Sequence, residues 1–212
     1  MLLKDKVVVL TGSNRGIGKS IMKLFHSEGA NIFACARMQT AEFEAVLEEQ
    51  SKYGAGFIQP IYFDLRNSAE IKEAIQKIVS YTKKVDVLVN NAGIASGSLF
   101  QMTPISKISE EFEVNFFSQL LFSQSIARLM VRAKTGSIVN MASVSGLLGD
   151  SGTISYGSSK AALMYATKVM ARELGEYNVR VNAIAPSVTK TDMLDQMESG
   201  AKDRMILSTA LK

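Results

Sequence analysis

Apolar positions fall into two kinds of segment along the chain. Six short runs are almost continuously apolar, a pattern typical of strands buried on both faces of a parallel sheet. The predicted strands are residues 6–10, 31–36, 56–63, 85–92, 136–143 and 179–185. Between them lie longer segments with apolar residues at helical spacing. The predicted helices are Ile17–Glu28, Ala41–Tyr53, Ser68–Thr82, Ser109–Ala133 and Ser155–Glu176.

Strand and helix alternate along the whole length, which predicts a doubly wound α/β fold. In this three-layer arrangement, the Rossmann fold, helices cover both faces of one parallel sheet through right-handed connections. The sequence has no internal repeat, linker or low-complexity segment, so we predict one domain over residues 1–212. Ligands of such sheets bind beyond the carboxyl ends of the strands. The residues that follow each apolar run are therefore the candidates for a site.

The segment after the first run, TGSNRGIG, is rich in glycine. Its glycines allow a tight turn and a close approach of the backbone to a ligand, and the helix that follows offers free N–H groups to a phosphate. The spacing differs from the Gly-x-Gly-x2-Gly dinucleotide fingerprint, but the position between first strand and first helix favours a dinucleotide. The candidate binding residues are Gly12, Ser13, Asn14, Arg15, Gly16, Ile17 and Gly18.

Two arginines indicate which dinucleotide this is. A protein that selects NAD usually carries an acid at the end of the second strand, where it binds the adenosine ribose. Here Ala36 stands at that place and Arg37 follows it, with Arg15 expected nearby. Two guanidinium groups suit the 2′-phosphate of NADP(H), through forked charge-assisted hydrogen bonds. The alternative is that both arginines are solvated surface residues.

Polar residues also follow the third and fourth runs. Asp64, with Leu65 after it, can accept a hydrogen bond from an adenine amino group, or it merely ends its strand. The NNAG segment, Asn90–Gly93, has amides that can lock a turn while its backbone lies along the cofactor, although two asparagines can also be plain turn formers. The candidates in this segment are Asn91, Ala92 and Gly93.

The last predicted helix begins with a tyrosine and a lysine one turn apart. Tyr156 and Lys160 share a helix face, and a fixed cation close to a phenol favours the phenolate and lowers its pKa. Such a tyrosine suits general acid or base catalysis, although the same pair is common on solvated surfaces. Ser143 ends the fifth run 13 residues earlier, where it either acts on the same substrate or serves as a turn or cap residue.

Composition argues against several other chemistries. A single histidine, His26, and a single cysteine, Cys35, disfavour zinc clusters and disulfides. A Ser-His-Asp hydrolase would need His26, which we expect on a helix surface, and we expect Cys35 to be packed. The net charge of +4 is spread without a basic run, so we expect no nucleic-acid partner. No apolar window of 18 residues or signal peptide is present, which predicts a cytoplasmic protein without membrane spans.

Together these motifs resemble the short-chain dehydrogenase/reductase family. TGxxxGIG, NNAG, the Asn of VNFF, a Ser before YxxxK, and RVNAIAP stand in the family's order over essentially the whole chain, and are most similar to its 3-oxoacyl-[acyl-carrier-protein] reductase branch. The resemblance implies that Tyr156 protonates a carbonyl oxygen as hydride arrives from nicotinamide, and that Ser143 hydrogen-bonds the same oxygen. Lys160 would hold the nicotinamide ribose and lower the pKa of the tyrosine. Asn115 would hold a water that connects Lys160 to solvent.

The implied reaction is the NADP(H)-dependent reduction of a carbonyl to a secondary alcohol. The implied substrate is a 3-oxoacyl thioester on acyl carrier protein, in fatty-acid synthesis. The alternatives are a sugar, steroid or polyol substrate, an epimerase or dehydratase, and a non-catalytic truncated dinucleotide-binding subunit. Family habit further implies a homotetramer or dimer, with the helices of Asn115 and Tyr156 packing between subunits.

The C-terminal region departs from the family pattern. Pro186, Ser187 and Thr191 are expected along the nicotinamide, but Ser187 stands where the family usually has glycine. Family members normally continue into a last helix and a seventh strand that we do not find here, so the sixth strand is expected to be an exposed edge. Residues 190–212 are expected to form a mobile substrate lid or tail.

Overall fold

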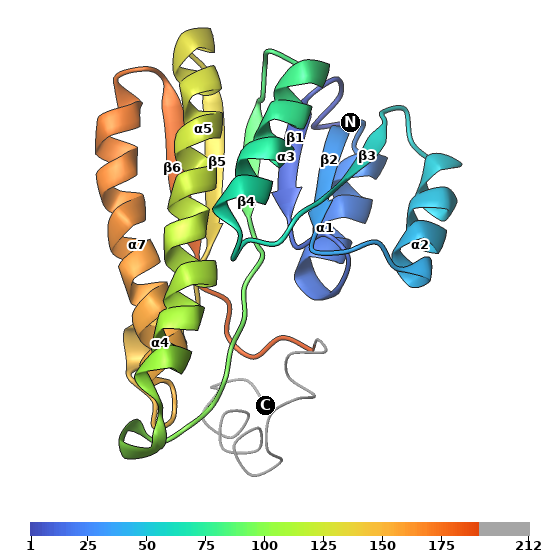
Figure 1. Cartoon of the computed structure of the whole chain (residues 1–212). Coiled ribbons are helices and arrows are strands. Elements are labelled where there is room, and N and C mark those ends of the chain that lie inside the picture. The colour runs from blue at the N-terminus through green and yellow to red at the C-terminus, as the bar shows by residue number, and fades with distance from the viewer. Residues whose placement is uncertain (191–212) are drawn as a thin grey trace.

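Six parallel strands form one sheet in the computed structural model, which describes residues 1–190. They are β1 (Val7–Thr11), β2 (Asn31–Ala36), β3 (Ile58–Tyr62), β4 (Val87–Asn90), β5 (Gly136–Met141) and β6 (Val179–Ile184). The strand order is β3-β2-β1-β4-β5-β6 (Figure 1). The order reverses between β1 and β4, and this switch point is where an open α/β sheet receives its ligand.

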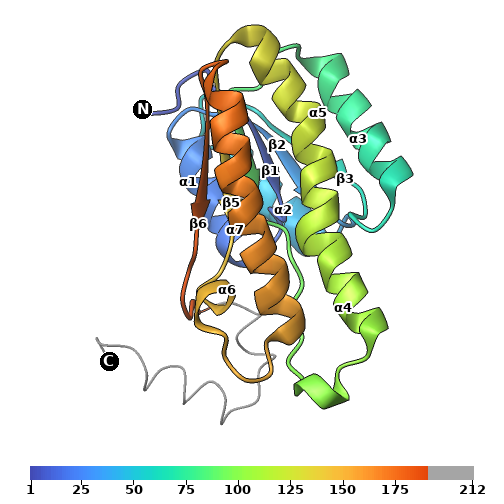
Figure 2. The same ribbon diagram turned by 90° about the vertical axis from the view of Figure 1, so that its left-hand side faces the viewer.

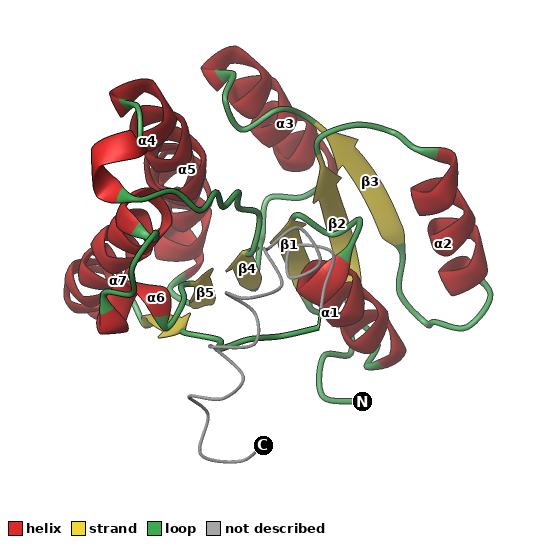
Figure 3. Ribbon diagram, turned by 90° about the horizontal axis from the view of Figure 1, so that it is seen from below, coloured by secondary structure: helices red, strands yellow, loops and turns green. Residues whose placement is uncertain are grey.

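Helices cover both faces of the sheet (Figure 3). They are α1 (Gly16–Ser27), α2 (Ala41–Ser51), α3 (Ser68–Tyr81), α4 (Ile105–Phe112), α5 (Ser118–Ala133), α6 (Ser145–Leu148) and α7 (Ile154–Gly175), with a 3₁₀ turn η1 (Phe100–Met102) and a π-helical turn η2 (Glu113–Phe117). Successive strand residues alternate between the faces. Val8 and Leu10 pack with the core under α1 and α2, whereas Val9 packs with the core under α3, α5 and α7. The predicted three-layer Rossmann fold is confirmed.

The predicted helix over residues 109–133 is a composite of three segments. It begins earlier, at Ile105, and the π-helical turn η2 separates α4 from α5. Asn115 lies in this turn, and its side chain bonds the backbone of Ile94 on the loop after β4. The sequence did not predict the turn, because a π-helical segment depends on such a tertiary contact and leaves the apolar periodicity on either side intact.

The prediction for His26 is wrong. The ring is 1% exposed, and its Nε2 lies 3.0 Å from the carbonyl oxygen of Gly56. The segment between α2 and β3 covers this side of α1, so a position that reads as surface from the helix alone is buried by the chain that returns over it. Cys35 is packed in the core as predicted.

The last described strand, β6, pairs with β5 and with no second strand among residues 1–190. The expected lid or tail over 190–212 falls almost entirely outside the described residues, and so does Thr191. None of the helices in residues 1–190 combines the length and apolarity that crossing a bilayer requires.

Candidate active site

The glycine loop after β1 and the NNAG loop after β4 interlock at the switch point. The Asn91 side-chain amide donates to the carbonyl oxygens of Thr11 and Gly12, both at 3.0 Å. The backbone N–H groups of Asn91 and Ala92 both donate to the Thr11 hydroxyl oxygen, again at 3.0 Å. Asn91 therefore holds the turn as predicted from its residue type, while Thr11 is a partner that the sequence analysis missed.

Glycine is required where these loops approach each other. A Cβ on Gly18 would lie 2.0 Å from the carbonyl oxygen of Gly12, and Gly12 itself has a φ of +67°. The first turn of α1 contains no acidic residue, and Arg15 at its N-cap forms no side-chain cap. The helix therefore presents free N–H groups and its positive dipole end beside a tightly packed glycine cradle, an arrangement that suits a phosphate.

Ser13 serves the loop and does not reach into the cradle. Its hydroxyl and its backbone N–H both donate to the carbonyl oxygen of Cys35, at 3.0 and 3.1 Å. The side chain is fully buried, so any contribution of Ser13 to a ligand has to come from the backbone of the loop it anchors to β2. Asn14 and Ile17 are partly exposed in the same loop.

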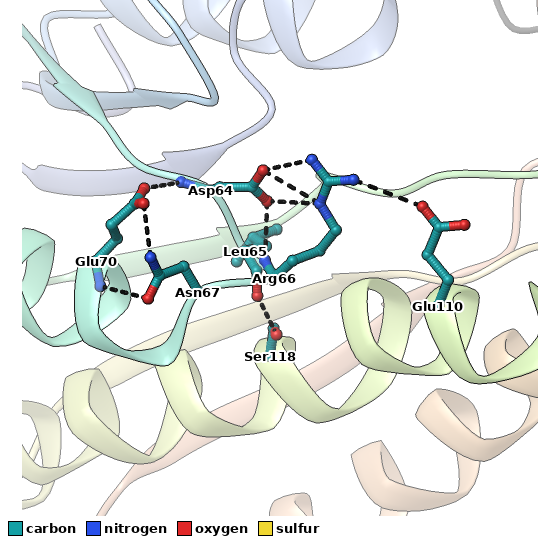
Figure 4. Close-up of polar contacts among 7 residues, drawn as sticks. All are labelled: Asp64, Leu65, Arg66, Asn67, Glu70, Glu110 and Ser118. Atoms are coloured by element: carbon teal, nitrogen blue, oxygen red, sulfur yellow. Dashed lines mark hydrogen bonds and ion pairs between the residues drawn. The ribbon is translucent and has the colours of Figure 1, made fainter. Parts of the chain in front are cut away.

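Asp64 follows β3 and is held by an arginine that the sequence analysis did not consider. The Arg66 guanidinium donates to Asp64 through Nη2 at 2.6 Å and Nε at 3.1 Å, and its Nη1 lies 3.6 Å from a Glu110 oxygen of α4 (Figure 4). The Ser118 hydroxyl of α5 donates to the carbonyl oxygen of Leu65. The β3–α3 loop is thus tied to the helices on both sides of the π-helical turn.

Arg66 also sets the ionisation of this carboxyl group. Its hydrogen bonds hold the pKa of Asp64 below the ordinary value, and the charge of Arg37 acts in the same direction. Arg37 therefore lies near Asp64 at the carboxyl edge of the sheet. Within residues 1–190 neither Arg37 nor Arg15 forms an ion pair, and both side chains are exposed.

Ser143 and Tyr156 meet at the carboxyl end of β5. Burial raises the pKa of the Tyr156 phenol, a hydrogen bond from Ser143 opposes that rise, and the charge of Glu111 adds to it. The Ser143 oxygen also accepts from the backbone N–H of Ser145 at 3.2 Å, at the start of α6. Ser143 is therefore a turn residue and a partner of the tyrosine at once, so the two alternatives left open for it are not exclusive.

Lys160 is buried behind the tyrosine. Its side chain is 3% exposed, and its ammonium donates to the carbonyl oxygen of Met141 at 2.7 Å while lying 5.8 Å from the centre of the Tyr156 ring. Burial lowers the pKa of Lys160 to about 8. The predicted lowering of the tyrosine pKa by this lysine is not what the structure shows, because the ammonium is directed to Met141 and burial dominates at Tyr156.

Asn115 connects this pair to the NNAG loop. Its amide exchanges hydrogen bonds with the backbone of Ile94, at 2.8 and 2.9 Å, and donates to the Ser159 hydroxyl of α7 at 3.1 Å. A Cβ on Gly93 would lie 3.1 Å from the Asn115 oxygen and 3.4 Å from the Lys160 ammonium. The two groups therefore border one small polar volume, for which the absence of a side chain at Gly93 makes room.

These groups converge from separate parts of the chain on one edge of one sheet. A family model for short chain dehydrogenases matches residues 6–202. The chain belongs to the short-chain dehydrogenase family. It is 33% identical over 203 residues to the 3-oxoacyl-[acyl-carrier-protein] reductase FabG of Thermotoga maritima, which covers 96% of this chain and 82% of that protein.

Other relatives of this short-chain dehydrogenase have different names. It is 34% identical over 194 residues to a 3alpha-hydroxysteroid dehydrogenase of Mediterraneibacter gnavus, covering 92% of this chain and 78% of the relative. The crystal structure of L-sorbose reductase from Gluconobacter frateurii, complexed with NADPH and L-sorbose, superposes with a TM-score of 0.86 at 27% identity, over 92% of this chain and 73% of that one. The predicted family is confirmed.

A network of buried, hydrogen-bonded polar side chains connects β4, β5, α5 and α7 next to the site. The Asn90 amide donates to the Ser123 hydroxyl at 2.6 Å and to the Asn140 oxygen at 2.8 Å, and Asn140 donates to Thr167 at 2.8 Å. Asn90, the last residue of β4, therefore connects this strand to α5 and β5 by hydrogen bonds and does not act as a turn former. The sequence signal was available, since polar residues inside apolar strands have to find partners.

The segment that follows β6 passes the carboxyl edge of the sheet. The carbonyl oxygen of Pro186 accepts from the backbone N–H of Val144 at 3.1 Å, one residue beyond Ser143. Pro186 therefore lies beside the residues that follow β5, and the prediction that Pro186 and Ser187 line the nicotinamide stays a prediction. The part of the segment that contains Thr191 lies outside the described residues.

The buried Lys160 predicts a pH-dependent stability. Unfolding returns its pKa from about 8 to about 10.5, so between these values the unfolded chain binds more protons and stability rises with pH. Relative to Lys160→Met, the free energy of unfolding of the native protein should rise by about 3 kcal/mol from pH 7 to 10.5. Urea denaturation of both proteins measures this difference, and parallel pH curves would contradict it.

Proposed function

We propose that this protein is an NADP(H)-dependent reductase that converts a 3-oxoacyl thioester, carried by acyl carrier protein, to the secondary alcohol in the cytoplasm. The observation that carries the proposal is the convergence of Ser143, Tyr156 and Lys160 beside the glycine cradle. Carbonyl reduction is the chemistry of the family, and the curated relative from Thermotoga maritima is named for this particular substrate.

The chain's own residues divide the work on the carbonyl. Tyr156, kept protonated by burial, donates its proton to the carbonyl oxygen as negative charge develops there. Ser143 donates a hydrogen bond to the same oxygen. Lys160 and Asn115 border the polar volume through which a proton can return to the tyrosine. The nicotinamide cofactor, when bound, supplies the hydride.

The residues present fit a dinucleotide. The glycine cradle has no room for a side chain at Gly12 or Gly18, and Gly16 begins α1 with its free N–H groups. Asp64 and Leu65 are the residues that we propose for the adenine, and Arg37 is close to Asp64. The two exposed arginines, without carboxylate partners in residues 1–190, support the phosphorylated form of the cofactor.

The surface beside the catalytic edge supports an apolar substrate. Leu147 and Leu148 of α6 and Ile154 at the start of α7 are exposed within one short stretch of chain around Ser143 and Tyr156. An acyl chain gains from covering such side chains. A steroid would gain as well, which makes a hydroxysteroid the second candidate, whereas sugars and polyols offer little apolar surface.

A homodimer is part of the proposal. α5 and α7 lie side by side on the outer face (Figure 2), and a shallow groove runs between them. Its walls are largely apolar, with Leu120, Ala127 and Val131 on one side and Val169 and Met170 on the other. Two copies that meet on this face would bury it. Asn115 lies in η2, just before α5, and Tyr156 lies in the first turn of α7.

Cofactor choice is the first test. NADPH should bind at least about tenfold more tightly than NADH, a difference of about 1.4 kcal/mol, and the double variant Arg15→Ala/Arg37→Ala should lose this preference. Nucleotide fluorescence titration of the purified chain measures both. Arg172→Ala, which removes the same charge from the exposed last turn of α7, is the matched control and should behave as the native protein.

Each result of this titration has a distinct meaning. Tighter binding of NADH would overturn the proposal that NADP(H) is the cofactor and would favour the epimerase alternative. Binding of NADPH without turnover of any 3-oxoacyl thioester or hydroxysteroid would favour the non-catalytic alternative.

A further inference from the structure

A buried carboxylate lies in the catalytic region without a role in the mechanism above. Glu111 of α4 has no exposed surface. One of its oxygens accepts from the hydroxyl of Ser96, on the loop that leaves β4, and the other, Oε2, has no hydrogen-bond partner among the described residues. An unpaired buried carboxylate oxygen is costly, so its presence calls for a reason.

A second buried oxygen without a hydrogen-bond partner in the described part of the chain lies on the facing helix, at the equivalent position relative to the Asn115–Ser159 bond. α5 and α7 both run against the strand direction on the same face of the parallel sheet, so the two helical columns run in parallel (Figure 2). Asn115 bonds Ser159 across them, and four residues earlier on each column stand Glu111 and Ser155. Ser155 is 2% exposed, and its hydroxyl oxygen also lacks a partner within residues 1–190.

These two orphans adjoin the catalytic tyrosine in sequence and in space. Ser155 immediately precedes Tyr156, and α4 packs against α7. Two buried, unpaired oxygens at one level of a helix interface are the usual setting for an ordered bridging water. Glu111 on α4 and the first turn of α7, which carries the phenol, therefore border the same helix interface.

We propose that Glu111 is a positioning residue of the reaction: its buried charge, anchored by Ser96 and facing Ser155, holds the hydroxyl of Tyr156 in the protonated form that donates to a carbonyl. The inference rests on the proposed role of Tyr156 as the acid. The electrostatics act in the direction that this role requires: burial raises the pKa of Tyr156, and the charge of Glu111 raises it further.

The cations near Glu111 are bound to other groups. On α4, Lys107 pairs with Glu110 at 2.9 Å, and Glu110 also faces Arg66 from the β3–α3 loop. On α7, the ammonium of Lys160 is bound to the carbonyl oxygen of Met141. Glu111 forms no ion pair with any described residue; the ammonium of Lys107, which is bound to Glu110, is a nearby cation whose charge also interacts with Glu111.

The test is a titration of the phenol itself. With tyrosine labelled by ¹³C at Cζ, NMR follows each ring against pH, and Tyr156→Phe assigns the resonance of Tyr156. Glu111→Gln keeps the shape and the hydrogen bond to Ser96 but removes the charge, so the Tyr156 midpoint should move to lower pH. Glu110→Gln, one residue earlier with a side chain that is 36% exposed, is the matched control and should leave the midpoint in place.

A second variant protects the test against misfolding. Glu111→Leu removes the unpaired oxygen together with the charge, so it should fold at least as stably as the native protein and show the same shift. An unmoved midpoint in either folded variant, or an equal shift in Glu110→Gln, would overturn the proposal.

Kinetics give a separate result with acetoacetyl-CoA and NADPH. The falling alkaline limb of the reduction rate should move to lower pH in Glu111→Gln, in step with the midpoint. A shifted midpoint without turnover of this thioester would retain the role of Glu111 and reject the proposed substrate, so the two failures are distinguishable.

Discussion

Replacing Tyr156 by phenylalanine should lower turnover by about 10²–10⁴-fold, the usual contribution of a positioned general acid. The ring keeps its position in the first turn of α7, while the proton for the carbonyl oxygen is lost. Ser143 can still donate a hydrogen bond but cannot supply that proton without becoming an alkoxide. NADPH affinity should change little, because the glycine cradle and the two arginines do not touch the phenol.

A second tyrosine on the same helix supplies the control. Tyr165 of α7 is 71% exposed, and Tyr165→Phe should retain native turnover. Steady-state rates with acetoacetyl-CoA, together with NADPH titrations, separate chemistry from binding in both variants. A Tyr156→Phe protein that keeps a tenth or more of the native rate would show that another group donates the proton.

Replacing Gly18 by alanine should abolish tight cofactor binding and destabilise the fold. The new Cβ would lie 2.0 Å from the carbonyl oxygen of Gly12 and 2.5 Å from the Asn91 amide nitrogen. The first contact is backbone, and the second atom is fixed by two hydrogen bonds, so the two interlocked loops have to separate. Overpacking of this kind costs about 1–3 kcal/mol, and NADPH affinity should fall more than about tenfold.

The matched control is another helical glycine with open space around it. Gly175 ends α7, and a Cβ there meets no atom within 4 Å. Gly175→Ala should therefore stabilise the protein by about 0.5–1 kcal/mol through helix propensity. Urea denaturation and NADPH titration measure both variants. Native affinity in Gly18→Ala would show that the cofactor phosphates do not rest on this cradle.

The sequence predicted most of this molecule, because the signals concerned are local or depend on topology alone. Continuous apolar runs identified all six strands, since burial on both faces leaves no polar alternation. The motifs after the strands identified the family, and parallel topology alone brings those positions to one edge. Arg15, Arg37 and Asp64 were selected for the same reason.

Tertiary structure decided what depends on one segment meeting another. From the sequence, Arg66 is an ordinary loop residue, but in the structure it donates hydrogen bonds to Asp64. From the sequence, His26 is a surface residue, but in the structure the segment after α2 covers it. Glu111 looks like one of several solvated acids of an amphipathic helix, yet it is buried against Ser96. Short-range patterns determine secondary structure and the edge where the chemistry lies. Which charges are buried, and which are cancelled, is determined only by packing, because desolvation depends on every neighbour at once.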